Sequence, residues 1–181
     1  MRKQNRHSQK KEYDMSVQLS EKIDNLAALS GKYLTFNLGD EGYGLEILKV
    51  QEIIGIQTIT KIPRTPAYVK GVINLRGKVI PVIDLRTKFG MEELEFTRET
   101  CIIVVQVTRK DTNLVMGIIV DEVSEVLDIT SDQIEAAPTL GTSVDTHFIM
   151  GMAKTETAVK ILLDIDRVLS LEEIAALNQT A

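Results

Sequence analysis

The sequence predicts an all-β protein, arranged as two small barrels of about five strands each that pack together. Short runs rich in Val and Ile recur roughly every 8–12 residues and are joined by turn residues, a pattern typical of sandwiches and barrels. The strand patterns contain glycines that permit the sharp bends of a closing barrel, namely Gly44, Gly71, Gly117 and Gly151. About ten strands are too many for one small barrel. With 44% apolar but only 4% aromatic residues, the core must be aliphatic.

The chain is organised around a predicted β-hairpin over residues 69–84, VKGVINLRGKVIPVID. Two turns compete: a two-residue turn at Arg76-Gly77, which requires positive φ at Arg76, and a three-residue loop 75–77, which requires it only at Gly77. The three-residue loop is favoured because it collects an apolar face of Val69, Gly71, Ile73, Val79, Pro81 and Ile83. Pro81 cannot donate to a ladder, so one side of its strand should be an edge or a gap. Arg76 then occupies an exposed tip, a good position for a contact residue.

Before this hairpin, residues 1–30 are predicted to be a flexible basic leader without structure over 1–14, with enough helical periodicity over 17–29 for a short helix. Strands follow at 33–38 and 43–47, and 48–54 should begin as a helical turn and finish as a strand. A single helical turn at 85–89 closes the first part. The first barrel should comprise about 31–90 together with a C-terminal return over 155–181.

The second barrel is predicted over about 91–154, beginning with an acidic surface connection at 91–99. The run TCIIVVQVT at 100–108 is continuously apolar at its centre, as in a strand buried on both faces. Further strands are expected at 114–120, 123–129, 148–154 and 158–163, and a helical turn at 131–135. Ser170 and Glu173 form a capping box that should open a C-terminal helix to about Asn178.

Composition excludes several classes of function. The net charge of −5 and the scarcity of aromatic residues argue against a nucleic-acid binder. No apolar run approaches the roughly 20 residues of a membrane span, so direct membrane insertion is not expected. The basic start lacks a following apolar stretch and is no signal peptide. The single cysteine, Cys101, excludes an internal disulfide, and we expect a cytoplasmic protein.

No catalytic constellation is apparent, so we expect no enzyme, no cofactor and no metal. The two histidines are His7 in the leader and His147 in a loop without neighbouring cysteines or histidines. Cys101 opens an apolar strand, which favours a buried inert thiol over a nucleophile. Asp164 and Asp166 precede a helical turn, where capping is the expected role. Neither of the glycine-rich phosphate-binding motifs is present.

Four stretches resemble one family. They are FNLGDEGYGLEILKVQEI at 36–53, IPRTPAYVKGVINLRGKVIPVIDLRTKFG at 62–90, GIIVDEVSEVL at 117–127 and ILLDIDRVL at 161–169, and they are similar to the chemotaxis coupling proteins of the CheW family. The resemblance covers nearly everything after residue 31. It implies two SH3-like five-stranded β-barrels around a shared apolar core, and a non-catalytic adaptor. Its implied partners are the cytoplasmic tip of methyl-accepting chemoreceptors and the regulatory domain of the histidine kinase CheA.

The resemblance also implies receptor-binding residues. The LKVQEI segment contributes Val50, Glu52 and Ile53, and the NLRG tip contributes Arg76. Bordering residues carried over from the second barrel are Cys101, Ile102 and Val123. The resemblance leaves the kinase-binding residues unassigned. Beside the glycine of the NLRG tip this chain has Lys78 where family members carry another residue, so the charge at the tip differs from theirs.

The residues by themselves leave alternatives open at this site. Glu52 and Arg76 have opposite charges and could form a pair, which as an exposed pair would orient the tip more than stabilise the fold. Apolar spacing alone favours Val50 as ordinary core, and Glu52 and Arg76 fit a solvated pair equally well. The competing function is a ligand- or peptide-binding β-barrel module. An enclosed pocket beside Val50 and Arg76 would favour that module, and an open groove would favour the adaptor.

Overall fold

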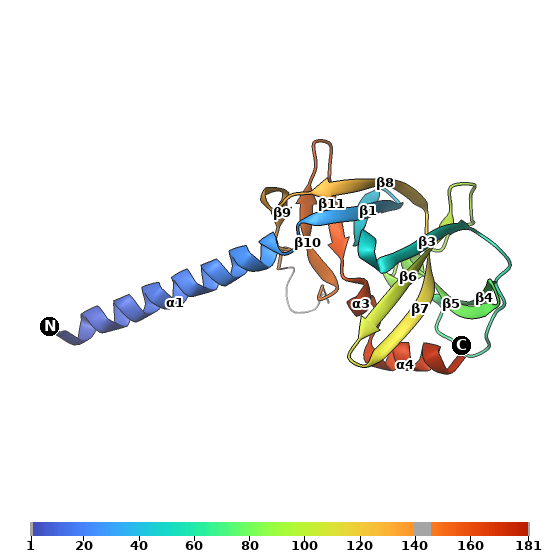
Figure 1. The fold of residues 1–181 in the computed structure, drawn as a ribbon, viewed down its shortest axis with the longest axis horizontal. Coiled ribbons are helices and arrows are strands. Elements are labelled where there is room, and N and C mark those ends of the chain that lie inside the picture. Colours follow the sequence, from blue (N-terminus) through green and yellow to red (C-terminus); the bar gives the residue numbers. More distant parts are fainter. Residues whose placement is uncertain (1, 140–145, 181) are drawn as a thin grey trace.

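Two β-sheets form the body of the fold in the computed structural model, which describes residues 2–139 and 146–180 (Figure 1). The six-stranded sheet has the order β8 (Glu122–Ile129), β1 (Gly31–Leu38), β2 (Glu41–Glu46), β11 (Val159–Leu163), β10 (Ile149–Lys154) and β9 (Ile134–Glu135). The five-stranded sheet has the order β3 (Val50–Gly55), β6 (Cys101–Arg109), β7 (Thr112–Val120), β5 (Lys78–Asp84) and β4 (Val69–Leu75). Both sheets curl, which confirms the predicted all-β class of two packed, barrel-like units.

The strands are divided between the sheets differently from the predicted barrels. β3, β4 and β5 belong to the same sheet as β6 and β7, whereas the sequence reading placed residues 31–90 in one barrel and 91–154 in the other. The parallel pairing of β5 with β7 and the antiparallel pairing of β3 with β6 bring these strands together. Turn residues report only on strands that are neighbours along the chain, so neither long-range pairing left a local signal.

The interior strand β6 is buried on both faces over residues 102–105, as its apolar run predicts. Ile103 and Val105 pack into the core shared by both sheets, while Ile102 and Val104 project into a second cluster inside the five-stranded sheet. Alternate side chains of a strand point to opposite faces, so one strand serves both clusters. A third cluster, around Tyr33 and Leu162, lies within the six-stranded sheet.

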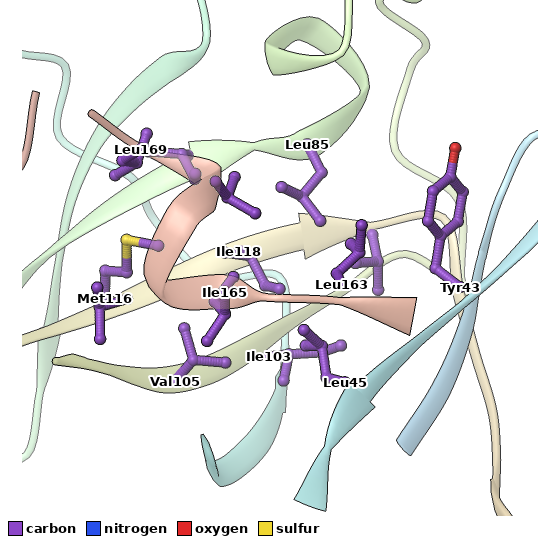
Figure 2. Packing of buried hydrophobic residues seen from close by; sticks show 14 of the residues in the cluster. Tyr43, Leu45, Leu85, Ile103, Val105, Met116, Ile118, Leu163, Ile165 and Leu169 are labelled. Atoms are coloured by element: carbon purple, nitrogen blue, oxygen red, sulfur yellow. The ribbon is translucent and has the colours of Figure 1, made fainter. Parts of the chain in front are cut away.

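The C-terminal return closes the shared core. Figure 2 shows Leu163, Ile165 and Leu169 packed among Ile103, Met116 and other apolar residues of the two sheets. Ile165 lies in α3 (Ile165–Val168), whose first turn is capped by the Asp164 side chain, as expected. The core is therefore one aliphatic body between the sheets, completed by a segment distant in sequence.

The remaining short helices match their sequence signals. α2 (Leu85–Lys88) is capped by Asp84, and α4 (Leu171–Thr180) begins at the predicted capping box. In this box Ser170 N donates to the Glu173 carboxylate at 2.6 Å, and Glu173 N donates to the Ser170 hydroxyl at 3.1 Å. The 3₁₀ turns η1 (Ile47–Lys49) and η2 (Ser131–Gln133) lie at the other two of the three places where helical turns were expected.

The N-terminal region differs from the expected leader. Residues 2–27 form one helix, α1 (Arg2–Ala27), which projects away from the sheets (Figure 1). Its base contacts the sheets: Leu26 and, just beyond the helix, Leu29 pack against the third cluster, and the Tyr33 hydroxyl donates to the Leu29 carbonyl at 2.6 Å. The polar residues at its start are good helix formers but leave no local signal for where such a helix must begin.

Glu173 joins α4 to the five-stranded sheet. Its carboxylate accepts from Lys88 Nζ at 2.6 Å and from the Tyr68 hydroxyl, while the Lys88 ammonium lies 4.5 Å from the centre of the Tyr68 ring. Partial burial raises the pKa of Glu173, but hydrogen bonds from Lys88, Tyr68 and Ser170 outweigh it and lower the pKa below its usual value.

We expect Glu173→Gln to lower the free energy of unfolding by about 1 kcal/mol at pH 7, allowing for the water that still reaches the carboxylate. A carboxyl whose pKa is lowered by folding stabilises the protein above its ordinary pKa of 4.5 and loses that contribution as pH falls. The difference between wild type and variant should therefore shrink below pH 4.5 in urea unfolding series. A gap of constant size between pH 7 and pH 3 would contradict this account of Glu173.

Candidate functional site at the hairpin tip

The hairpin of β4 and β5 ends in a two-residue turn, so the predicted three-residue loop is wrong. Leu75 pairs with Lys78, and both turn residues have positive φ, 51° at Arg76 and 85° at Gly77. Asn74 explains why Arg76 accepts this backbone conformation: its Oδ1 accepts from Gly77 N at 2.8 Å and fastens the turn. This corrects the apolar face as well: Ile73 pairs with Ile80, and Val79 is exposed.

Pro81 behaves as predicted. It lies opposite Val72 in β4, and the ladder between β5 and β7 includes only residues from Val82 onward. The missing donor of the proline therefore falls where β5 has no partner on its β7 side.

Arg76 and Glu52 form the expected ion pair, and it is bidentate. The two terminal nitrogens of Arg76 donate to the two carboxylate oxygens of Glu52 at 2.9 and 2.6 Å. The Arg76 side chain is 77% exposed, and that of Glu52 is 23% exposed. β3 and β4 are the two edges of the five-stranded sheet, so this pair reaches across the gap that the curling sheet leaves.

A bulge in β3 places Val50 and Glu52, both in the LKVQEI segment, on opposite faces of the five-stranded sheet. Val50 lies opposite Val105 and Glu52 opposite Val104, with Gln51 as the extra residue between them. Val50 therefore packs against the shared core, while Glu52 lies on the side of the cluster inside the five-stranded sheet. Ile53 returns to the first side and is 45% exposed.

The other predicted contact residues are less accessible. Ile102 is fully buried in the cluster inside the five-stranded sheet, so in this conformation it supports the surface and does not reach a partner. Cys101 and Val123 are half-buried and pack on the shared core. Burial raises the pKa of the Cys101 thiol, partly offset by a hydrogen bond with the backbone of Val123, so the thiol stays neutral at pH 7.

An open hollow of about 250 Å³ lies beside the ion pair. Its lining combines the pair itself with neighbouring residues of β3, β4, β5 and β7, namely Gln51, Leu75, Lys78, Ile80 and Val115. Gln51, Arg76 and Lys78 are exposed, so the hollow opens onto the surface. No local pattern in the sequence indicates Val115 here, because the pairing of β7 with β6 and β5 brings it close.

The described parts of the chain were expected to lack a metal site and a membrane-spanning helix. Over residues 2–139 and 146–180 no three His, Cys, Asp or Glu side chains gather closely enough to hold a metal ion. No helix among these residues is both long and apolar enough to cross a membrane. Two curled aliphatic sheets that present an ionic tip are a class of fold suited to binding another molecule through its surface.

Comparison of this chain with known proteins identifies its family. Residues 32–173 match the CheW-like domain. The chain is 41% identical over 150 residues to the chemotaxis protein CheW of Klebsiella aerogenes, covering 83% of this chain and 88% of that protein. It is 35% identical to the CheW of Bacillus subtilis over 142 residues, or 78% and 88% of the two chains. The crystal structure of the scaffolding protein TtCheW from Thermoanaerobacter tengcongensis superposes with a TM-score of 0.69 at 38% identity, covering 80% of this chain and 96% of that one.

The chain belongs to the CheW family, whose members are chemotaxis scaffold proteins without catalytic activity. The motifs of the sequence and the fold point to the same family.

Proposed function

We propose that this protein couples the cytoplasmic tips of chemoreceptors to the histidine kinase CheA, in the cytoplasm at receptor arrays. The tip of the β4–β5 hairpin and strand β3 form the receptor-facing surface, with Val50, Glu52, Ile53 and Arg76 as its candidate contacts. Cys101 and Val123 border this surface, and Ile102 supports it from below.

The observation that carries the proposal is the exposed but rigid Arg76. A solvent-exposed ion pair contributes only about 0–1 kcal/mol to stability, so its bidentate geometry is better explained by presentation of the tip. The Asn74 hydrogen bond fixes the backbone of the turn, and Glu52 holds the guanidinium before any partner arrives. The neighbouring hollow is open, and its lining combines long polar side chains with apolar ones, which suits a protein surface better than an enclosed small molecule.

We expect Arg76→Ala and Glu52→Ala each to weaken binding of a receptor signalling fragment by about 2 kcal/mol, or roughly 30-fold, while the unfolding free energy changes by less than about 1 kcal/mol. A partner would bury the pair, and truncating one member then leaves the other charge unpaired. Pull-downs against the receptor fragment and against the CheA regulatory domain, done separately, measure both contacts.

Arg76→Gly distinguishes the effect of the Arg76 side chain on binding from the effect of the turn conformation. Glycine adopts positive φ freely, so this variant should be at least as stable as wild type yet bind the receptor fragment as weakly as Arg76→Ala. The control is Lys110→Ala, which removes an exposed cation with positive φ from the turn between β6 and β7. Undiminished receptor binding by all three tip variants would refute the placement of this surface.

A further inference from the structure

The hollow beside Arg76 is the open end of the cluster inside the five-stranded sheet. Ile80 belongs to that cluster and is 4% exposed, and Leu75 and Val115 are packed against it. These three side chains give the hollow an apolar floor at the point where the curled sheet stops. An apolar floor that reaches the surface can accept an apolar side chain from outside.

The rim of the hollow is cationic. Glu52 and Arg76 neutralise one another, which leaves Lys78 as the uncompensated charge among the lining residues. Lys78 pairs with Leu75 across the hairpin and therefore projects to the same face as Ile80, over the mouth of the cluster. It is exposed, and no ion pair or hydrogen bond of its ammonium occurs among the described residues.

We infer that this mouth takes an apolar side chain of the receptor helix while Lys78 binds a carboxylate next to that side chain. The inference rests on the proposed function and specifies the chemistry of the partner: an apolar residue flanked by Asp or Glu on an exposed helix face. Arg76 orients the approach through Glu52, and Lys78 selects for the negative charge. Two contacts of different kinds, one apolar and one ionic, give the mouth a specificity that neither has alone.

The test uses the full chain and a soluble signalling fragment of a chemoreceptor as the probe. Lys78→Glu should weaken binding about tenfold, and Lys78→Arg should leave it within about threefold of wild type. Lys110→Glu makes the same change of net charge in the turn between β6 and β7 and should have little effect. Binding by Lys78→Gln should respond less steeply to added NaCl than binding by wild type. An acidic residue of the fragment changed to Lys should restore binding to Lys78→Glu.

Methyl NMR spectra give a readout that does not depend on affinity. On addition of the fragment, the methyl signals of Ile80 and Val115 should shift. If Arg76→Ala loses binding while Lys78→Glu binds normally and these methyl signals stay in place, the inference about the mouth is overturned and the proposed function stands. If wild type does not bind the fragment, both are overturned.

Discussion

Gly71→Ala is expected to lower the free energy of unfolding by about 3 kcal/mol or more. Gly71 has φ of 139°, a conformation that side chains with a Cβ rarely adopt, and an added Cβ would lie 2.0 Å from the Thr60 carbonyl oxygen. That oxygen cannot move away, because it accepts from Val72 N at 2.9 Å, and Thr60 N donates back to Val72 O at 2.9 Å. This bridge fastens the connection after β3 to the edge strand β4.

The matched control is Gly55→Ala, at the end of β3. No atom lies within 4 Å of a Cβ there and φ is not in the left-handed region, so the change should stay within about 1 kcal/mol. Urea unfolding of both variants measures the difference. Because the bridge holds the edge on which the Arg76 tip stands, Gly71→Ala should also weaken receptor binding. Equal stability of the two variants would show that the Thr60 bridge is easily displaced.

Arg86→Met is expected to lower the free energy of unfolding by about 2–3 kcal/mol. This is at or below the low end of the loss for breaking a buried ion pair, because Asp121 keeps some contact with water. The Arg86 side chain is 11% exposed and that of Asp121 is 30% exposed. Arg86 Nη1 donates to Asp121, and Nε donates to the Glu92 carbonyl at 2.9 Å. Asp121 also accepts from Gly39 N, so one arginine ties α2, the 91–99 connection and the end of β7 together.

Methionine keeps an unbranched stem of similar shape. The loss of unfolding free energy in Arg86→Met therefore measures the charge and hydrogen bonds of Arg86 more than its packing. Thermal or urea unfolding should show that adding Asp121→Asn to Arg86→Met recovers part of the loss, since the stranded charge is then removed. Lys32→Met is the control: it breaks the exposed pair with Asp128, whose side chains are 62% and 69% exposed. Losses of equal size in Arg86→Met and Lys32→Met would contradict the role given to Arg86.

The sequence was most informative where a structural feature depends on neighbouring residues. The capping box at Ser170, the helical turn before β3 and the pair of Glu52 with Arg76 were all expected and are all present. The double burial of β6 followed from the absence of polar residues in its centre. Each of these features is decided by a few side chains at fixed spacing, which a single sequence displays directly.

The wrong predictions have two causes, one in a side chain close to the turn and the others in contacts between residues far apart in the sequence. The turn at Arg76 was assigned by the usual cost of positive φ, and the Asn74 side chain that fastens Gly77 reverses that preference. An Asn three residues before the Gly was the available signal. The grouping of β3 to β5 depends on long-range pairings with β6 and β7. The packing of the base of α1 against the third cluster is likewise a contact between segments that a local pattern does not display.

The central claim is that this chain joins two other proteins and performs no chemistry of its own. Its most direct test is sedimentation of CheA with assembled receptor signalling fragments, with and without this protein. The account predicts that the protein brings CheA into the pellet, and that Arg76→Gly fails to do so while still binding the CheA regulatory domain. CheA that sediments to the same extent with wild type, with Arg76→Gly and with no added protein would contradict it.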